Sequence, residues 1–393
     1  MRVAIVGAGI GGLTTAIALA RRGLEPRLIE RSLVLEEVGA GIQLSPNAVR
    51  VLEALGLREA MAESMVEARA IHIRRGQDGR EILALPLADA RQRWGAPYAT
   101  IRRADLQSLL VDAVRAARLP LDLGHALVAD ECRLPATDEA PRLVLDTPAG
   151  RMEAEADVVI GADGLWSSVR RAMGQTSAPV FQRKRAHRAI LPIADLPRDI
   201  DPTVTGLWLG EDAHLVHYPV SSGRAVNIVA VVRDEDAAQG WSRPSADGEV
   251  AGAFARWTRP VRDLIAAAPG FQSWPLHDRP PDRAWTRGRT ALLGDAAHPM
   301  VPFLAQGGAM AIEDAAVLAA RLTETSAPLP VRLARYAADR QPRTARVQTE
   351  ARANGDRYHW GTARSAARDL GLTLLGAQRM LARYDWLYRW CPP

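Results

Sequence analysis

Three short apolar runs lie far apart in the chain, and each ends at a glycine. They cover residues 2–7, 158–160 and 291–293, and they lead into a glycine cluster, Gly-Ala-Asp-Gly and Gly-Asp, respectively. Their length, their branched side chains and their lack of polar alternation predict strands that are buried on both faces. Buried strands that stop at glycine and aspartate are typical of a sheet whose strand ends meet a ligand.

The first run opens a strand–turn–helix–strand unit. Residues 13–22 have alanine and leucine at helical spacing with Gly23 as a stop, and residues 26–30 form the next strand. Further helices are predicted over residues 46–55, 103–117, 165–173 and 308–322, with a hairpin at 70–75 and 81–85 and strands on both sides of 148–150.

The segment from about residue 175 to 285 has a different character. Proline, tryptophan and strand-like alternation increase, and residues 205–209, 213–220 and 226–232 predict three strands of an antiparallel sheet. The last 60 residues are predicted to be largely helical. The pattern therefore indicates an α/β chain of two domains, or of one large domain with an insertion.

Composition excludes several classes of protein. The net charge is +5, but Lys184 is the only lysine and no basic block occurs, so nucleic acid is not an expected partner. The two cysteines, Cys132 and Cys391, exclude a disulfide framework. No charged leader and no apolar run of about 18 residues is present, so we expect a cytoplasmic protein with no membrane partner.

The glycines after the first run have the spacing of a dinucleotide-binding turn. In Gly7-x-Gly9-x-x-Gly12, the first glycine permits the turn, the second lets a pyrophosphate approach the backbone, and the third lets the helix pack on the strand. The helix N-terminus offers free amides to the phosphates. Glu30 ends the second strand, where a carboxylate can accept both ribose hydroxyls. This motif alone fits NAD, FAD or a glycine-rich turn in another α/β protein.

The pair Gly294-Asp295 favours a flavin. A carboxylate at this strand end suits a hydroxyl of the ribityl chain. The sequence then runs through Gln306-Gly307-Gly308 into a predicted helix, whose first amides can face the pyrimidine edge of a flavin, where negative charge develops on reduction. The alternative is that Asp295 is an ordinary helix cap.

Taken together, the motifs resemble those of the single-component (group A) flavoprotein aromatic hydroxylases. The matching residues are Gly7, Gly9 and Gly12, the Asp163-Gly164 pair within Val-Ile-Gly-Ala-Asp-Gly, and Gly294-Asp295 within Leu-Leu-Gly-Asp-Ala-Ala-His-Pro. Residues 39–47, 302–307, 354–360 and 384–390 are similar to the salicylate hydroxylase and 6-hydroxynicotinate monooxygenase branch. The resemblance covers nearly the whole chain.

The resemblance implies an FAD site and NADH or NADPH as a transient visitor over the flavin, since no second GxGxxG motif is present. The cofactor-binding residues that it implies are Gly7, Gly9, Gly12, Glu30, Arg31, Gly41, Arg103, Gln107, Val128 through its main chain, Asp163, Asp295, Gln306, Gly307 and Gly308. Asp163 would serve both the flavin and its reduction. The family often has histidine where this chain has Arg102, to which we assign no role.

Substrate chemistry is expected in the run from His214 to Pro219. In a strand, His214 and His217 point to opposite faces, so at most one faces the flavin. We favour His214, where this branch often has a substrate-contacting histidine, because an imidazole can accept a phenolic proton near neutral pH. His217 is the second candidate, and a structural imidazole is the alternative at both positions. Pro302 resembles the loop proline whose carbonyl faces the substrate. No metal ligands are expected.

We therefore expect an α/β fold similar to that of p-hydroxybenzoate hydroxylase. A Rossmann-like FAD-binding domain (residues 1–72, 98–174 and 286–325) would carry an inserted β-rich substrate domain (73–97 and 175–285) and a helical C-terminal region (326–393).

The expected reaction is hydroxylation of a salicylate-like aromatic acid with NAD(P)H and O2 through a flavin hydroperoxide, with loss of CO2 where the attacked carbon bears the carboxylate. Hydroxylation of 3-hydroxybenzoate at carbon 6 or of 6-hydroxynicotinate at carbon 3 is the alternative, weakened by Pro302 and Gln43. A flavin oxidase and a flavin-binding sensor are the other classes. A halogenase is disfavoured, because Lys184 lies far past the position of its catalytic lysine. We expect a monomer or a homodimer.

Overall fold

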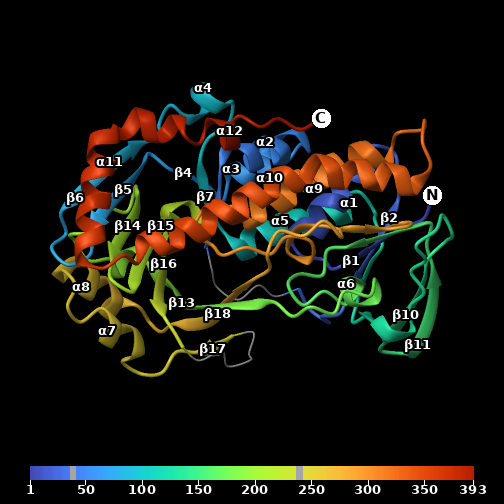
Figure 1. Cartoon of the computed structure of the whole chain (residues 1–393), viewed down its shortest axis with the longest axis horizontal. Coiled ribbons are helices and arrows are strands. Elements are labelled where there is room, and N and C mark those ends of the chain that lie inside the picture. Colours follow the sequence, from blue (N-terminus) through green and yellow to red (C-terminus); the bar gives the residue numbers. More distant parts are fainter. Residues whose placement is uncertain (36–40, 236–241) are drawn as a thin grey trace.

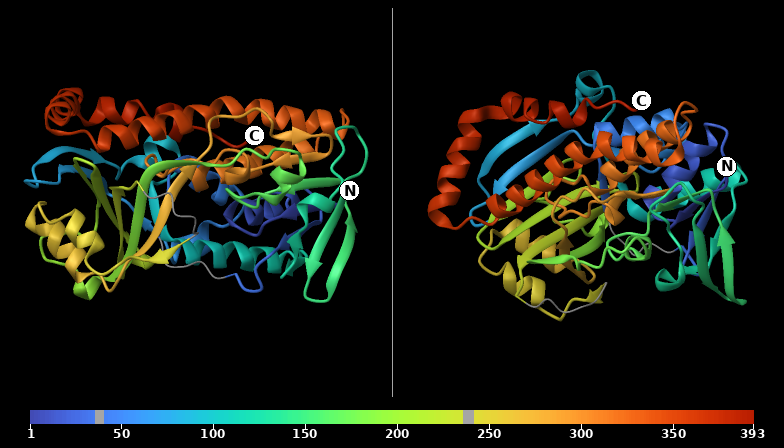
Figure 2. Two further views of the ribbon diagram at one scale, coloured as in Figure 1. Left: turned by 60° about the horizontal axis from the view of Figure 1, so that its bottom comes forward. Right: turned by 45° about the vertical axis from the view of Figure 1, so that its right-hand side comes forward.

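The computed structural model describes residues 1–35, 41–235 and 242–393. Two large sheets organise these residues, and long C-terminal helices run along both of them (Figures 1 and 2). The expected α/β architecture, with its inserted β-rich region and helical C-terminus, is confirmed. None of the helices within the described residues combines the length and the apolar character of a membrane span.

The first sheet has six strands among the described residues, in the order β19-β20-β12-β1-β2-β8. Their bounds are Thr286–Arg287, Thr290–Leu292, Val158–Gly161, Val3–Val6, Pro26–Glu30 and Leu121–Leu123. β1 lies between β2 and β12, and β20 lies next to β12, all in parallel register. The three apolar runs of the sequence therefore lie side by side, and their carboxyl ends meet at one edge, as predicted.

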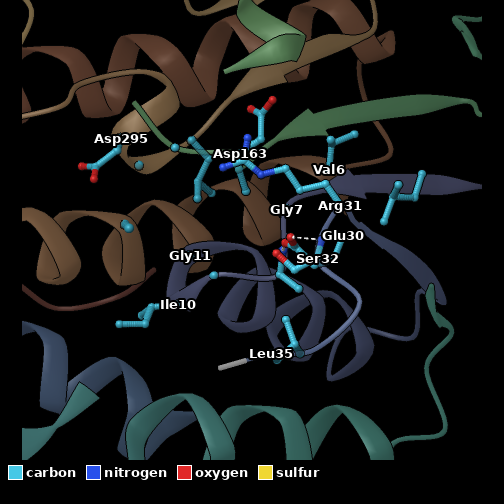
Figure 3. Close-up of a pocket in the computed structure, with 18 of the residues that line it drawn as sticks. Val6, Gly7, Ile10, Gly11, Glu30, Arg31, Ser32, Leu35, Asp163 and Asp295 are labelled. Carbon is cyan, nitrogen blue, oxygen red and sulfur yellow. Dashed lines mark hydrogen bonds between the residues drawn. The ribbon is translucent and has the colours of Figure 1, made fainter. Parts of the chain in front are cut away.

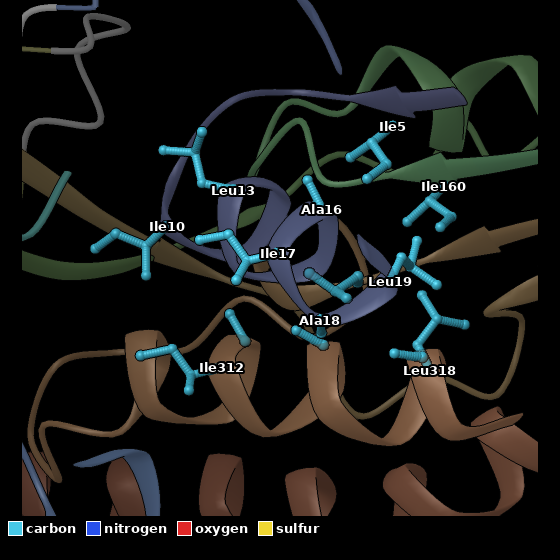
Figure 4. Close-up of a cluster of buried hydrophobic side chains, with 14 of the residues drawn as sticks. Ile5, Ile10, Leu13, Ala16, Ile17, Ala18, Leu19, Ile160, Ile312 and Leu318 are labelled. Atoms are coloured by element: carbon cyan, nitrogen blue, oxygen red, sulfur yellow. The ribbon is translucent and has the colours of Figure 1, made fainter. Parts of the chain in front are cut away.

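Helices cover this sheet and bury its core. α1 (Ile10–Ala20) packs against α9 (Gly307–Leu322) and α5 (Arg103–Ala116). Ile17 and Leu19 of α1 lie with Ile312 and Leu318 of α9 in one apolar cluster beside Ile5 of β1 (Figure 4). Because almost every side chain of β1 is buried, the strand lacks polar alternation in the sequence.

The second sheet has eight strands among the described residues, in the order β17-β18-β13-β16-β15-β14-β5-β6. Their bounds are Arg243–Pro244, Gln272–Asp278, Val180–Pro192, Ala225–Arg233, Ala213–Val220, Thr205–Gly210, Ala70–Arg75 and Glu81–Pro86. The predicted strands β14, β15 and β16 and the hairpin β5–β6 are confirmed. β13 and β18 were not predicted. β13 carries four basic residues within Gln182–Arg188. Arg185 and His187 are nevertheless buried, because each has a polar partner, so the strand does not show the usual alternation of apolar and polar residues.

Two small sheets and short helices complete the described chain. One sheet has β11, β10 and β9 (Gly150–Glu155, Arg142–Thr147, Ala126–Leu127), and the other has β3, β7 and β4 (Gly41–Leu44, Ala99–Arg102, Val66–Glu67). The short helices are α2 (Pro46–Ala54), α3 (Arg58–Ala62), α4 (Ala90–Trp94), α6 (Ser168–Ala172), α7 (Glu249–Ala253) and α8 (Arg259–Ala267).

The C-terminal helices connect the two sheets. α10 (Leu329–Tyr358) begins beside β19 and β20 and packs on α9, while α11 (Thr362–Ala382) packs on β6 at the far edge of the second sheet (Figure 1). α12 (Asp385–Tyr388) then returns to α2. One continuous helix thus fixes the first sheet relative to the second.

Candidate cofactor and substrate site

A cavity of about 460 Å³ lies at the carboxyl ends of β1, β2, β12 and β20. Figure 3 shows Gly7, Glu30, Asp163 and Asp295, from three distant parts of the chain, around this space. The expected cofactor residues that line it are Gly7, Gly9, Glu30, Arg31, Arg103, Gln107, Asp163, Asp295, Gly307 and Gly308.

The glycines of the first turn act as the spacing predicts. A Cβ at Gly12 would lie 1.9 Å from the Gly7 carbonyl oxygen, so this glycine lets the helix approach the turn and does not itself line the cavity. A Cβ at Gly9 would meet nothing within 4 Å, so the backbone there is open to the cavity. No side chain caps the first turn of α1, and its amides are available to an anion.

Glu30 holds the end of β2 against this turn. Its Oε2 accepts a hydrogen bond from the Ala8 amide at 2.8 Å, and its Oε1 accepts one from the Ser32 amide at 2.9 Å. Each carboxylate oxygen has a second lone pair. The side chain is therefore oriented by the backbone while it faces the cavity, as a ligand for vicinal hydroxyls requires.

Asp163 and Asp295 face the same cavity in different ways. The Asp163 carboxylate accepts hydrogen bonds from Ser167 Oγ at 2.5 Å, the Ser168 amide at 2.6 Å and the Val169 amide at 3.0 Å. Burial raises its pKa, although these three bonds oppose the rise. The carboxylate therefore organises the turn before α6, while Oδ1, which accepts only the Ser167 bond, keeps a second lone pair at the cavity.

Asp295, by contrast, makes no hydrogen bond with the described residues, and its side chain is open to the cavity. Neither the 3₁₀ turn Gly294–Ala296 nor α9 has a side-chain cap, so the alternative of a helix cap is not observed. Desolvation by the surrounding protein raises the pKa of Asp295, against the charges of His298 and Arg103. An unpaired carboxylate that faces a cavity is a strong acceptor for a ligand hydroxyl.

A buried polar network, which the sequence did not reveal, supports the turn that carries Asp295. Asp314 of α9 accepts a hydrogen bond from the Gly294 amide at 3.1 Å and lies 2.5 Å from His298 Nε2. Arg340 of α10 donates to Asp314 and to Glu313, each at 2.7 Å. Burial alone would raise the pKa of Asp314, but His298 and Arg340 hold it at about 2.

Four expected cofactor residues lie outside the cavity lining: Gly12, Gly41, Val128 and Gln306. The Val128 amide donates to the Val144 carbonyl at 2.9 Å, and the Val128 carbonyl accepts from the Glu131 amide. Both main-chain groups of Val128 therefore already make hydrogen bonds within the protein. Ala126 and Leu127 line the cavity there. Gln306 donates from Nε2 to Ser45 Oγ at 2.9 Å and belongs to the buried network rather than to the cavity wall.

The second sheet brings candidate substrate residues to the flank of this cavity. Gly41 of β3 abuts Tyr218 of β15, since a Cβ at Gly41 would lie 2.6 Å from the Tyr218 ring, while the neighbouring Ile42 lines the cavity. Tyr218 shares a face of β15 with His214, four residues earlier. Burial raises the pKa of Tyr218, and the charge of Arg188 opposes this. Tyr218 was not predicted as a site residue, although its spacing of four from His214 in a predicted strand places both side chains on one face.

His214 and His217 lie on opposite faces, as expected. His214 is buried, and its ring centroid lies 5.3 Å from that of Phe303, in the loop between Asp295 and α9. His217 packs on Trp208 in the other apolar layer, and burial lowers its pKa to about 4. The structure therefore does not bring His217 together with His214. The Pro302 carbonyl accepts the Ala305 amide at 3.0 Å within the same loop as Phe303.

The fold and cavity define a dinucleotide-binding α/β protein with an added second sheet. Residues 1–351 match the FAD binding domain family. The chain is 40% identical to 3-amino-4-hydroxybenzoate 2-monooxygenase of Streptomyces cremeus (91% of this chain, 88% of the relative) and 36% identical to 3-hydroxybenzoate 6-hydroxylase 1 of Aquipseudomonas alcaligenes (98% and 96%). A solved salicylate hydroxylase substrate complex superposes with a TM-score of 0.81 at 28% identity, over 99% of this chain and 95% of that one.

The chain therefore belongs to the FAD binding domain family and, within it, to the group A flavoprotein hydroxylases. Its cofactor is FAD, and hydroxylases of this group use NAD(P)H as co-substrate. The residues of the cavity fit this group: an open glycine turn at uncapped amides, a carboxylate at the end of β2 and an unpaired carboxylate at Asp295.

Proposed function

We propose that this protein is an FAD-dependent monooxygenase that uses NAD(P)H and O2 to hydroxylate an aromatic acid bearing a ring hydroxyl. The observation that carries the proposal is a cavity lined by Gly9, Glu30 and Asp295 that lies beside β3. Gly41 of β3 in turn packs on Tyr218, on the face of β15 that also bears His214. The names of the relatives, which act on hydroxylated benzoates, support the same class of substrate.

The residues of the cavity would hold the cofactor in one orientation. The α1 amides and Gly9 would bind the pyrophosphate, Glu30 the adenosine ribose, and Asp295 the ribityl chain. The first turn of α9, at Gly307 and Gly308, would place amides and the positive end of the helix dipole at the pyrimidine edge. Bound FAD supplies the redox chemistry, taking hydride from NAD(P)H and activating O2 for transfer to the ring.

The substrate ring would lie between β15 and the loop that carries Pro302 and Phe303. His214 would accept the proton of the ring hydroxyl through Nε2, because its Nδ1 is engaged elsewhere and no described residue bonds Nε2. The positive charge of Arg188 opposes the rise in the pKa of Tyr218, and the same guanidinium would bind the carboxylate of the substrate. Phe303 and Tyr358 enclose His214 and would exclude water. We assign no catalytic role to His217.

Among hydroxylated acids, 3-amino-4-hydroxybenzoate and 3-hydroxybenzoate have support from the relatives, and salicylate from the similar solved structure. The 6-hydroxynicotinate 3-monooxygenase of Bordetella bronchiseptica is 36% identical, so this ring belongs in the same test. All four carry a carboxylate and a ring hydroxyl, which is the common chemistry that Arg188 and His214 would recognise.

We further propose the expected division into an FAD-binding domain, a substrate domain and a helical C-terminal region, with one adjustment. β5 begins at Ala70 and pairs with β14, so the substrate domain begins at residue 70 rather than at 73. The free thiols of Cys132 and Cys391 suit the reducing cytoplasm that we propose for a monomer or homodimer. Gel filtration with light scattering tests the oligomeric state.

The test is NAD(P)H oxidation by the holoenzyme with and without each of the four acids, with product identified by mass spectrometry. We expect one acid to accelerate oxidation at least tenfold and to yield one product heavier by one oxygen, or that product less CO2. Hydrogen peroxide formed without NAD(P)H would instead indicate an oxidase. FAD that no NAD(P)H reduces, with or without acid, would indicate a sensor, and either result would overturn the proposal.

A further inference from the structure

A second histidine lies directly behind His214. His214 Nδ1 is 2.7 Å from Nε2 of His359, the residue that follows the end of α10, and the two ring centroids are 5.0 Å apart. The pair joins β15 to a helix 145 residues away in sequence. The two nitrogens lie within hydrogen-bond distance, and one N–H between them satisfies both when the pair is neutral.

Beyond His359, the protein opens to a second cavity of about 700 Å³, separate from the cofactor cavity. Its lining includes His359 with Lys184, Asp212 and Asp356. His359 is half-buried, whereas His214 is 2% exposed, so the pair leads from the protein interior to a polar, solvent-containing space. The Asp212 amide donates to the His359 carbonyl at 3.3 Å, which holds the end of α10 against β15.

We propose that His214 and His359 form a proton relay that carries the proton of the substrate hydroxyl from the buried ring site to the second cavity. This inference rests on the proposed function, and it assigns to His359 a positioning and proton-transfer role that the cofactor site does not require.

The transfer balances without any other reactant. The O–H bond of the substrate breaks and a bond forms to His214 Nε2, the Nδ1 proton of His214 passes to His359 Nε2, and the Nδ1 proton of His359 passes to water. One proton enters and one leaves, each imidazole ends neutral in its other tautomer, and no electron moves. The reverse sequence returns a proton to the product.

The charged groups around the histidine pair favour transfer of a proton over its retention. Lys184 of β13 faces it from beside the Phe303 ring, with its Nζ 5.9 Å from the ring centroid and 3.6 Å from the Asp356 carboxylate of α10. Tyr358 of α10 and Asp212 at the β14–β15 turn also lie beside the pair. The second cavity is further lined by Arg183, Arg233, Arg357 and Arg364. Burial, followed by the Lys184 charge, lowers the pKa of His359 to about 3, and burial also lowers that of His214. A proton that arrives is therefore passed on rather than retained.

The experiment compares the wild-type holoenzyme with His359→Gln and His359→Ala. Glutamine retains an acceptor for His214 Nδ1 but cannot pass a proton on, so His214 keeps its orientation. Each protein is mixed rapidly, in weak buffer with a pH-indicator dye, with whichever of 3-amino-4-hydroxybenzoate, 3-hydroxybenzoate, salicylate and 6-hydroxynicotinate stimulates NAD(P)H oxidation. Arg364→Gln, at an exposed residue that lines the second cavity outside the pair, is the matched control.

We expect proton release to slow at least tenfold in both His359 variants, with FAD content and substrate affinity unchanged. Added imidazole should restore release in His359→Ala but not in His359→Gln, and Arg364→Gln should match the wild type. Lys184→Met should move the acidic limb of the activity profile to higher pH, because a neighbouring positive charge is gone.

Release at the wild-type rate in His359→Gln would overturn the relay. That result is distinct from failure of the proposed function, in which the wild-type enzyme itself would hydroxylate none of the four acids.

Discussion

At the scale of single residues, the two aspartates of the cavity show how similar motifs differ in chemistry. The Asp163 carboxylate accepts three hydrogen bonds from its own turn, whereas the Asp295 carboxylate makes none with the described residues. A carboxylate that faces a cavity without a protein partner keeps its oxygens available to a ligand. We therefore propose that the Gly-Asp motif offers the freer acceptor to the cofactor, and that the Asp-Gly motif chiefly shapes the cavity wall.

Asp295→Ala should weaken FAD binding. Hydrogen bonds to a charged group contribute about 1.5–3 kcal/mol, so the Kd for FAD should rise roughly 10- to 100-fold. Titration of apoprotein with FAD, followed by flavin fluorescence, measures this. Asp163→Ala is the matched comparison, and it should chiefly lower the thermal midpoint, because it removes the cap before α6. Equal FAD affinity in Asp295→Ala and wild type would refute the assignment.

At the scale of elements, α9 and α10 hold the cofactor turn through buried charges. Glu313 and Asp314 are fully buried, and Arg340 bridges them. Asn47 of α2 donates to Glu313 at 2.6 Å, so the network also reaches the helix after β3. Removing one partner from such a network leaves uncompensated charge, which costs far more than the pair itself contributes.

Arg340→Met should lower the free energy of unfolding by about 3–5 kcal/mol. Arg335→Met, on the same helix but at a half-exposed ion pair with Glu324, should cost less than about 1 kcal/mol. Urea unfolding of the two variants, followed by tryptophan fluorescence, gives the comparison. Similar losses in both would mean that the network does not stabilise the fold.

The elements also show what the sequence can and cannot predict. β1, α1 and β2 were predictable because each is defined by a local pattern of apolar residues and glycines. β13 was not, because its buried Arg185 and His187 have partners, Asp234 and Ser245, that lie 49 and 58 residues away. The candidate site follows the same rule. The glycine motif and Asp295 are visible as local sequence patterns, whereas His214 and His359 are far apart in sequence and meet only where the end of α10 packs against β15.

At the scale of the whole molecule, α10 transmits the position of one sheet to the other. Its 30 residues span about 45 Å, from β19 and β20 at its start to His214 at its end. Along the way Arg352 pairs with Asp278 of β18 and Asn354 donates to the Phe303 carbonyl. The cofactor cavity and the face of β15 that bears His214 are thus held by one helix.

Burial of neutral histidines should make the stability of the whole protein depend on pH. Burial lowers the pKa of His187 and His217 to about 4 and of His359 to about 3, and that of His214 falls as well. The histidines of the unfolded chain take up protons near pH 6.5, whereas the buried histidines of the folded chain stay neutral. Their contribution to the free energy of unfolding is therefore complete above about pH 6.5 and is lost as the pH falls.

Four such groups give a slope of roughly 5 kcal/mol per pH unit below pH 6. His217→Gln should reduce that slope by about 1.4 kcal/mol per unit, one proton's share, whatever its effect at neutral pH. Urea unfolding across this pH range measures the slope. An unchanged slope in His217→Gln would show that this histidine is not buried as a neutral group.

We expect residues near Gly9, Glu30 and Asp295 to surround a single FAD. The most direct test of this expectation is a titration of the purified apoprotein with FAD, followed by the flavin absorbance that is retained after desalting. We predict retention of one FAD per chain, with Asp295→Ala retaining less at the same concentration. A protein that stays colourless after FAD is supplied would contradict the account.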